Sequence, residues 1–218
     1  MRAMITKSIH CCISSPPYWR QKSYLEPGHE FKGKELGHEK TLKEYTENLA
    51  GIFHEVLRVL RSDGTLWVII GRGSLAREEG GNGPGPALRI IRELGKQGWI
   101  LQKNTRWNPK GLFSERLLLF SKSDNFYFQD DHNEDYELHE NISTWESPEE
   151  YLFTPNQPQF IAQCVLSGCP EGGIVIDPMM GTGTIGMVAN RLGRDYIGID
   201  IDPRSVALAG KLLKGEGK

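Results

Sequence analysis

The stretch G-G-I-V-I-D-P-M-M-G-T-G-T-I-G, residues 172–186, decides the fold of this chain. Its first part, 173–177, is a short β-branched apolar run that predicts a buried strand, and the glycines after it predict a tight turn. A helix is expected next, near 184–192. A strand that turns through glycines into a helix is typical of an open α/β sheet, where ligands bind at the carboxyl ends of the strands. The stretch therefore predicts a ligand site.

The glycines of this stretch have a known spacing. Gly181, Gly183 and Gly186 fit G-x-G-x-x-G, the dinucleotide fingerprint, and the first two would let a ligand approach the backbone. In the dinucleotide fold, however, the glycines follow the strand almost at once, whereas residues 177–180 intervene here. Asp177 would also repel a pyrophosphate, and its carboxylate better suits a ligand with an amine and a sulfonium. S-adenosylmethionine (AdoMet) carries both groups and a ribose.

A second carboxylate follows on the next predicted strand. Asp200 ends the run Y-I-G-I-D, residues 196–200. From the end of a strand its carboxylate can accept hydrogen bonds from both hydroxyls of a ribose. Asp200 is therefore a second candidate contact to AdoMet.

Near the other end of the chain, residues 14–19 read S-S-P-P-Y-W. They follow I-H-C-C-I-S (9–14), an apolar run that predicts a buried strand stopped by Pro16. Because Pro16 and Pro17 fix φ and lack an N–H, this strand end is expected to present carbonyl oxygens outward. A surface turn does not need the two aromatic rings that come next. Trp19 is expected either to line a pocket or to pack in the core.

Strands and helices alternate along the rest of the chain. A capping box at Thr41 and Glu44 predicts a helix start, and Asp63-Gly64 is expected to end that helix in a turn. Further strands are predicted at 65–70, 99–103 and 115–120, and further helices at 86–97, at 158–167 and from Pro203. This alternation predicts an α/β fold with a doubly wound, mostly parallel sheet. We expect a single domain over residues 1–218.

The composition is that of a soluble globular protein. Hydrophobic residues make up 38% of the 218 residues and charged residues 25%. No apolar run is long enough to span a membrane, and the N-terminus lacks an apolar signal region. The four cysteines form no C-x-x-C pair, so we expect reduced, mostly buried thiols in a cytoplasmic protein, and no metal site.

Charge is unevenly distributed, although the net charge is only −2. Residues 124–150 hold ten carboxylates, and no Lys or Arg occurs from 123 to 190. The simplest interpretation is a short insert with a solvated acidic face. Contacts to a polyanion must then come from basic residues elsewhere. The candidates are Arg20, Lys22, Lys32, Lys34, Arg106 and Lys110.

Taken together, these motifs resemble those of a known family. D-P-M-M-G-T-G-T (177–184) resembles the AdoMet-binding loop of the amino-methyltransferases of DNA, and S-P-P-Y (15–18) resembles their catalytic motif. In this chain the S-P-P-Y motif comes first and the AdoMet loop comes last, which resembles the motif order of the permuted, or beta, class of the family. The resemblance runs from Ile9 to Leu213. It implies an AdoMet-dependent, Rossmann-like methyltransferase fold with circularly permuted motif order, with the acidic insert at 124–150 in place of a full target-recognition region.

The resemblance also implies roles for individual residues. The family methylates N4 of cytosine or N6 of adenine in DNA. The catalytic residues are then Ser15, Pro16, Pro17 and Tyr18. The cofactor-binding residues are Asp177, Pro178, Met179, Gly181, Gly183, Thr184 and Asp200. The expected partners are DNA and a cognate restriction endonuclease, with no membrane contact.

The chemistry gives the S-P-P-Y motif a physical reason. The target amine lies inside a duplex, so the base must be flipped into the pocket, where Tyr18 can stack on it and contribute about 1–3 kcal/mol. The Pro16 carbonyl and the Ser15 hydroxyl can accept hydrogen bonds from the amine, which aims its lone pair at the methyl carbon. Transfer is then a direct displacement governed by positioning. Cys11 and Cys12 stay structural in this mechanism.

Three functions remain open. The first is DNA methylation at cytosine N4, because a serine before P-P-Y is more typical of N4 members; adenine N6 is the alternative. The second is a nicotinamide-dependent oxidoreductase, suggested by G-x-G-x-x-G. The third is an inactive DNA- or AdoMet-binding relative, because the strand with a Gly-Asp pair that family members usually carry upstream is not found before Ile9.

Overall fold

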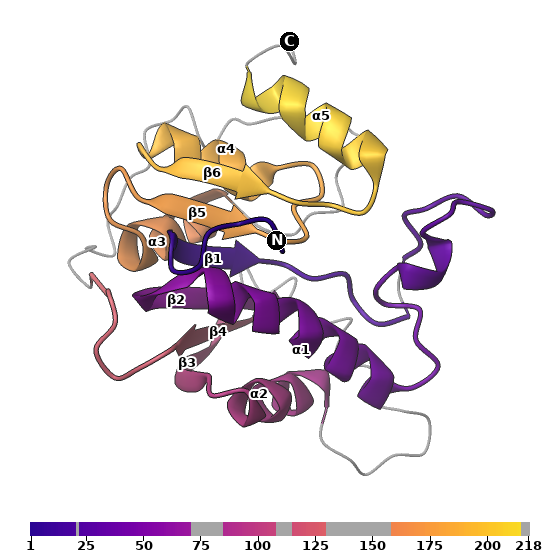
Figure 1. Ribbon diagram of the computed structural model, residues 1–218, viewed down its shortest axis with the longest axis horizontal. Coiled ribbons are helices and arrows are strands. Elements are labelled where there is room, and N and C mark those ends of the chain that lie inside the picture. Colours follow the sequence, from indigo (N-terminus) through magenta and orange to yellow (C-terminus); the bar gives the residue numbers. More distant parts are fainter. Residues whose placement is uncertain (21, 71–84, 108–114, 130–157, 215–218) are drawn as a thin grey trace.

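The computed structural model describes residues 1–20, 22–70, 85–107, 115–129 and 158–214. Its centre is one six-stranded sheet in the order β3-β4-β2-β1-β5-β6, with helices on both faces (Figure 1). The strands are β1 (Ile9–Ser14), β2 (Leu60–Ile70), β3 (Ile100–Trp107), β4 (Glu115–Ser121), β5 (Ile174–Asp177) and β6 (Asp195–Gly198). The helices are α1 (Leu42–Val59), α2 (Pro86–Lys96), α3 (Pro158–Gly168), α4 (Thr184–Arg191) and α5 (Pro203–Leu213), with a short 3-10 helix η1 (Lys32–Lys34). The predicted doubly wound α/β fold is confirmed.

The directions of the strands follow from their connections. β2, β1, β5 and β6 run parallel to one another, whereas β4 is antiparallel to both β2 and β3. A parallel pair needs a crossover of roughly a dozen residues or more, and the chain between β3 and β4 is shorter than that. The two strands therefore form an antiparallel hairpin at one edge, and the sheet is mostly parallel, as predicted.

Two apolar layers attach the helices to the sheet (Figure 1). On one face, α1 and α2 pack against the sheet through buried residues such as Phe53 and Ile90. On the other face, α3 and α4 pack through residues such as Val165 and Val188. All four cysteines are free and buried, in agreement with the sequence prediction; they are Cys11, Cys12, Cys164 and Cys169. None of the helices in the described residues is long and apolar enough to cross a membrane.

Helix α1 begins where its sequence predicts. The Thr41 hydroxyl accepts a hydrogen bond from the Glu44 N–H (3.1 Å), and the Glu44 carboxylate accepts one from the Thr41 N–H (3.3 Å). This reciprocal pair satisfies two N–H groups that have no partner inside the helix. The predicted capping box is therefore confirmed.

The junction after α1 differs from the prediction. Strand β2 begins at Leu60, directly after the helix, so Asp63 and Gly64 lie inside the strand instead of in a turn. A Cβ atom on Gly64 would lie 2.9 Å from the carbonyl oxygen of His10. The glycine thus permits close approach of β2 to β1, and the sequence alone does not distinguish this use of glycine from a turn.

Parts of two sequence predictions lie outside the described residues. Residues 130–157 contain most of the acidic segment, and Lys110 is one of the candidate phosphate contacts. The acidic insert and the domain boundaries at 1–218 stay predictions.

Candidate cofactor and substrate site

The two motifs meet where the chain changes direction across the sheet. β1 and β5 are neighbours in the sheet although they are far apart in sequence. The chain continues from β1 to β2 on one side and from β5 to β6 on the other. Such a switch point leaves a crevice at the carboxyl ends of the strands, which is where open α/β sheets bind ligands.

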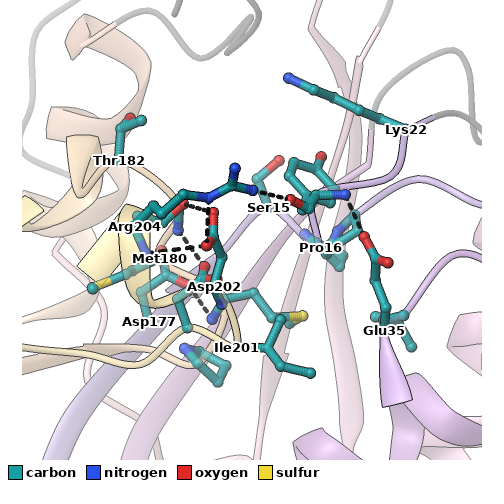
Figure 2. A pocket seen from close by; sticks show the side chains of 18 of the residues that line it. Ser15, Pro16, Lys22, Glu35, Asp177, Met180, Thr182, Ile201, Asp202 and Arg204 are labelled. Atoms are coloured by element: carbon teal, nitrogen blue, oxygen red, sulfur yellow. Dashed lines mark hydrogen bonds and ion pairs between the residues drawn. The ribbon is translucent and has the colours of Figure 1, made fainter. Parts of the chain in front are cut away.

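A cavity of about 600 Å³ lies at this switch point (Figure 2). All four residues of S-P-P-Y line it, from Ser15 to Tyr18. Six of the seven residues predicted for the cofactor also line it, namely Asp177, Pro178, Met179, Gly181, Thr184 and Asp200. The fold therefore brings both motifs to one cavity, whose volume lies in the usual range for small-molecule sites.

The glycines of the loop are required for different structural reasons. Gly181 has φ 51° and Gly183 has φ 84°, both in the left-handed region that favours glycine. A Cβ atom on Gly181 would meet no atom within 4 Å, which leaves the backbone open for a ligand. A Cβ atom on Gly183 would lie 2.9 Å from the Cβ of Ala209 in α5. Gly183 therefore permits helix packing, and it is not among the cavity-lining residues of the described chain.

The third glycine of the pattern also serves packing. A Cβ atom on Gly186 would lie 2.3 Å from the ring of Tyr196 on β6. The side chain is missing at this position because the aromatic ring of the neighbouring strand fills its place. In the G-x-G-x-x-G match, Gly181 thus leaves the turn open, whereas Gly183 and Gly186 permit close contacts with neighbouring elements.

Asp200 holds the glycine loop from the next strand. Its Oδ2 accepts a hydrogen bond from the N–H of Gly181 (2.8 Å), and its Oδ1 accepts one from the N–H of Asp202 (2.9 Å). Burial raises the pKa of Asp200, while these backbone hydrogen bonds oppose the shift. β6 ends at Gly198, so Asp200 lies two residues beyond the strand and not at its last position, which corrects the prediction. Each oxygen keeps a lone pair for a further donor.

Asp177 is the most buried carboxylate of the site, only 1% exposed. Its Oδ1 accepts hydrogen bonds from the hydroxyl of Ser14 (2.7 Å) and from the N–H of Met179 (3.0 Å). The pKa of Asp177 is raised to about 7, mainly by burial and also by the charge of Asp200, although the two hydrogen bonds lower it. The sequence analysis did not identify Ser14, because a small polar residue at the end of a strand has no distinctive pattern.

A hydrogen bond from helix α1 holds the S-P-P-Y segment in place. The carbonyl oxygen of Pro17 accepts a hydrogen bond from the hydroxyl of buried Tyr45 in α1 (2.9 Å). This corrects the expectation that both proline carbonyls face outward. Trp19 is 2% exposed, packs in the core and donates from Nε1 to the carbonyl oxygen of Glu39 (3.0 Å). Of its two expected positions, Trp19 therefore takes the one in the core.

Residues 22–36, which we call the strap, form a further wall of the cavity. The sequence analysis named Lys22, Lys32 and Lys34 of this segment only as candidate contacts to a polyanion. The cavity-lining residues of the strap include Lys22, Tyr24, Glu26, Lys34 and Glu35, and Glu35 holds the strap together. Lys22 and Glu35 are labelled in Figure 2. The Glu35 carboxylate accepts hydrogen bonds from the N–H groups of Tyr24 and Leu25 and from Nζ of Lys32 (2.6 Å). Burial opposes ionisation of Glu35, but these hydrogen bonds hold its pKa below the usual range.

Arg204, in the first turn of α5, links the strap to the cofactor side of the cavity. Its guanidinium donates to Glu26 Oε1 (2.8 Å), to the carbonyl oxygen of Tyr24 (2.5 Å) and to Asp202 Oδ1 (3.2 Å). No local pattern signals this contact, because its partners are separated by most of the chain. Arg204 thus joins two walls of one cavity (Figure 2).

Comparison with protein families shows the family of the chain. The model of the DNA methylases that act at N6 or N4 matches residues 9–211. The chain belongs to this DNA methylase family. The cofactor of the family is AdoMet, which agrees with the cofactor predicted from the glycine loop.

Curated relatives match this DNA methylase over nearly its whole length. Type II methyltransferase M.XycI of Xanthomonas campestris pv. cyanopsidis is 28% identical over 99% of this chain and 85% of its own length. Type II methyltransferase M.Cfr9I of Citrobacter freundii is 26% identical over the same shares of the two chains.

Solved structures share the fold of this DNA methylase. TTHA0409 of Thermus thermophilus, in its complex with S-adenosyl-L-methionine, has a TM-score of 0.62 and 22% identity, over 99% of this chain and 90% of that one. The cytosine-N4-specific PvuII DNA methyltransferase has a TM-score of 0.63 and 17% identity, over 99% and 89%. At these identities the likeness concerns the fold.

The cavity of this DNA methylase fits AdoMet on its own geometry. The open backbone at Gly181 leaves room for a ligand against the loop. Asp200 has lone pairs for ribose hydroxyls, and Asp177 lies between the glycine loop and the S-P-P-Y strand. The volume of about 600 Å³ lies within the range of cavities that bind small molecules.

Proposed function

We propose that this DNA methylase transfers a methyl group from AdoMet to N4 of cytosine in DNA. The observation that carries the proposal is that Ser15 and Tyr18 line the same cavity as the glycine loop and Asp200. A base that enters this cavity would lie against S-P-P-Y, with the cofactor residues on the opposite side. The serine before P-P-Y, which is more typical of N4 members of the family, favours cytosine.

The proposed roles follow from the positions of these groups. Asp200 accepts hydrogen bonds from the ribose hydroxyls, and the backbone at Gly181 lies against the cofactor. Tyr18 stacks on the flipped base, which requires only the face of its ring. The bound cofactor supplies an electrophilic methyl group.

On the substrate side, Ser15 and the carbonyl of Pro16 accept hydrogen bonds from the target amine and hold its lone pair toward the methyl carbon. The Pro17 carbonyl has a different use, because it is engaged by Tyr45. That hydrogen bond holds the backbone beside Tyr18 in place. Positioning of this kind is the main contribution a protein makes to a direct displacement.

Two alternatives from the sequence remain testable. Adenine N6 is the other target of the family, and an inactive relative would bind AdoMet without transfer. The nicotinamide-dependent alternative is disfavoured by the family match and by the close contacts that explain Gly183 and Gly186 without a pyrophosphate.

The decisive experiment is identification of the methylated base. Purified protein is incubated with AdoMet carrying a labelled methyl group and with duplex DNA of mixed sequence, and the digested product is analysed by mass. N4-methylcytosine is expected. N6-methyladenine as the sole product would overturn the cytosine assignment, and AdoMet binding without any labelled base would favour the inactive relative.

We also propose a cognate restriction endonuclease that reads the same DNA site. Support comes from the relatives, which are named Type II methyltransferases. DNA from cells that express this protein is expected to resist one endonuclease specificity and remain sensitive to others. Full sensitivity to every enzyme whose site contains the methylated base would contradict the proposal.

A further inference from the structure

A buried hydrogen bond connects the two halves of the site. The hydroxyl of Ser14, the last residue of β1, donates to Asp177 Oδ1 at the end of β5 at 2.7 Å. Ser14 is completely buried, and it directly precedes Ser15 of the S-P-P-Y segment. Asp177 begins the loop that leads to Gly181. The bond therefore joins the start of the catalytic segment to the start of the cofactor loop.

The ionised form of Asp177 depends on few donors. Its Oδ1 accepts from Ser14 and from the N–H of Met179, and no hydrogen bond to Oδ2 is seen in the described part of the chain. The titratable groups that face it are Cys12 from β1, Tyr196 from β6 and Asp200 from the segment after β6. None of them is a cation, so these neighbours offer no opposing charge.

Of the two donors to Asp177 Oδ1, the Met179 N–H belongs to the backbone, whereas the Ser14 hydroxyl belongs to a side chain and is uncharged. A hydroxyl that donates to a carboxylate favours the charged form over the protonated form. Without this donor, the buried carboxyl would take up a proton at a higher pH. The cavity would then lose a negative charge on the wall that faces a cationic ligand.

We propose that Ser14 is a positioning residue for cofactor binding, which keeps Asp177 charged and fixed beside the glycine loop so that the cavity attracts the amine and sulfonium of AdoMet. The proposal rests on AdoMet as the cofactor and does not depend on which base is methylated. Ser14 acts through Asp177 and has no contact with the reacting atoms in this proposal.

The test compares Ser14→Ala with Ser121→Ala. Ser121 is an equally buried strand serine on β4, which donates to the carbonyl oxygen of Ser123 at the same 2.7 Å and does not line the cavity. AdoMet affinity is measured by calorimetry from pH 6 to pH 9. With the pKa of Asp177 at about 7, about half of it is charged at neutral pH. A hydrogen bond to a charged group changes the ionisation equilibrium roughly tenfold.

Ser14→Ala is therefore expected to bind AdoMet about fivefold more weakly at pH 7, with recovery toward the unchanged affinity at pH 9. Ser121→Ala should follow the wild-type profile. Ser14→Thr, which keeps the hydroxyl, should restore most of the affinity at pH 7. An affinity of Ser14→Ala that equals wild type at every pH, or that is reduced equally at every pH, would overturn the proposal.

Asp177→Asn provides the second arm, because it removes the titrating group. Adding Ser14→Ala to Asp177→Asn should cost little further affinity, and the double variant should follow the pH profile of Asp177→Asn alone. A ligand-free measurement completes the test. Because the pKa of folded Asp177 is raised, the stability that this group contributes is lost as the pH rises through about 7. Ser14→Ala should lose more of its melting temperature between pH 6 and pH 9 than Ser121→Ala, and an equal loss would count against the proposal.

Discussion

The hydroxyl of Tyr45 in α1 donates a hydrogen bond of 2.9 Å to the carbonyl oxygen of Pro17, between the two residues Ser15 and Tyr18 that we place in catalysis. Proline lacks an N–H, so the P-P pair cannot be held by a backbone ladder from its donor side. A side chain from the helix that covers the sheet holds it instead. The position of the catalytic segment therefore depends on the packing of α1.

Tyr45→Phe should accordingly weaken both stability and transfer. The change leaves a partly buried carbonyl without its donor, which costs about 1–3 kcal/mol in the free energy of unfolding. The single-turnover rate should fall, while AdoMet affinity should stay within about twofold. Denaturant unfolding and labelled methyl transfer measure the two effects.

Tyr127→Phe is the matched control for Tyr45→Phe. It removes a hydroxyl whose hydrogen bond, to Gln129, is exposed and away from the cavity. Equal loss of transfer in both variants would show that Tyr45 has no special role in placing the S-P-P-Y segment.

Asp200→Ala should weaken AdoMet binding. The carboxylate holds the N–H of Gly181 and is expected to accept the ribose hydroxyls. Hydrogen bonds to a charged group contribute about 1.5–3 kcal/mol, so calorimetry should show a loss of roughly 10- to 150-fold. Asp195→Ala, at the exposed opposite end of β6, is the control and should bind as wild type. Unchanged affinity of Asp200→Ala would remove Asp200 from the cofactor site.

Tyr18→Ala should reduce methyl transfer far more than AdoMet affinity. The loss of the stacking ring costs about 1–3 kcal/mol in binding of the flipped base. Tyr18→Phe keeps the ring and should retain much of the activity. The measurement is labelled transfer to duplex and to unpaired DNA, together with calorimetry of AdoMet. Full activity of Tyr18→Ala would contradict a catalytic role for S-P-P-Y.

His10 should make the fold sensitive to acid. Its Nδ1 accepts a hydrogen bond from the N–H of Ile174 (2.9 Å) and so links β1 to β5 in the neutral form. Burial lowers the pKa of His10, and nearby Arg61 lowers it further. The folded state therefore binds a proton at His10 less readily than the unfolded state, in which the pKa of this side chain is 6.5. The stability from this group is complete above pH 6.5 and is lost as the pH falls through the lower folded pKa.

His10→Asn separates this effect from general acid unfolding. The amide oxygen of Asn can accept the same N–H without titrating. The melting temperature of wild type should therefore fall more steeply than that of His10→Asn between pH 6.5 and pH 5. Parallel curves would contradict the assignment.

Much of the site was predictable from the sequence, because its signals are local. Glycine spacing, a proline pair after a short apolar run, and a carboxylate after the next strand each occupy a few consecutive residues. The capping box at Thr41 is of the same kind. A backbone turn or a helix start is specified by the residues within it, so these patterns appear in the linear chain without knowledge of its folding.

Only the tertiary structure decided how these pieces are held. Ser14 with Asp177, Tyr45 with Pro17, and Arg204 with the strap 22–36 are contacts between residues far apart in sequence. Their energy comes from hydrogen bonds between side chains and groups of distant elements. The geometry of these bonds is set when β1 pairs with β5 and when α1 and α5 take their places in the fold. Gly183 and Gly186 likewise contact residues of neighbouring elements, Ala209 of α5 and Tyr196 of β6. The sequence by itself determined the family and the two motifs, whereas the burial that governs the charge of Asp177 exists only in the folded chain, because desolvation depends on every element around it.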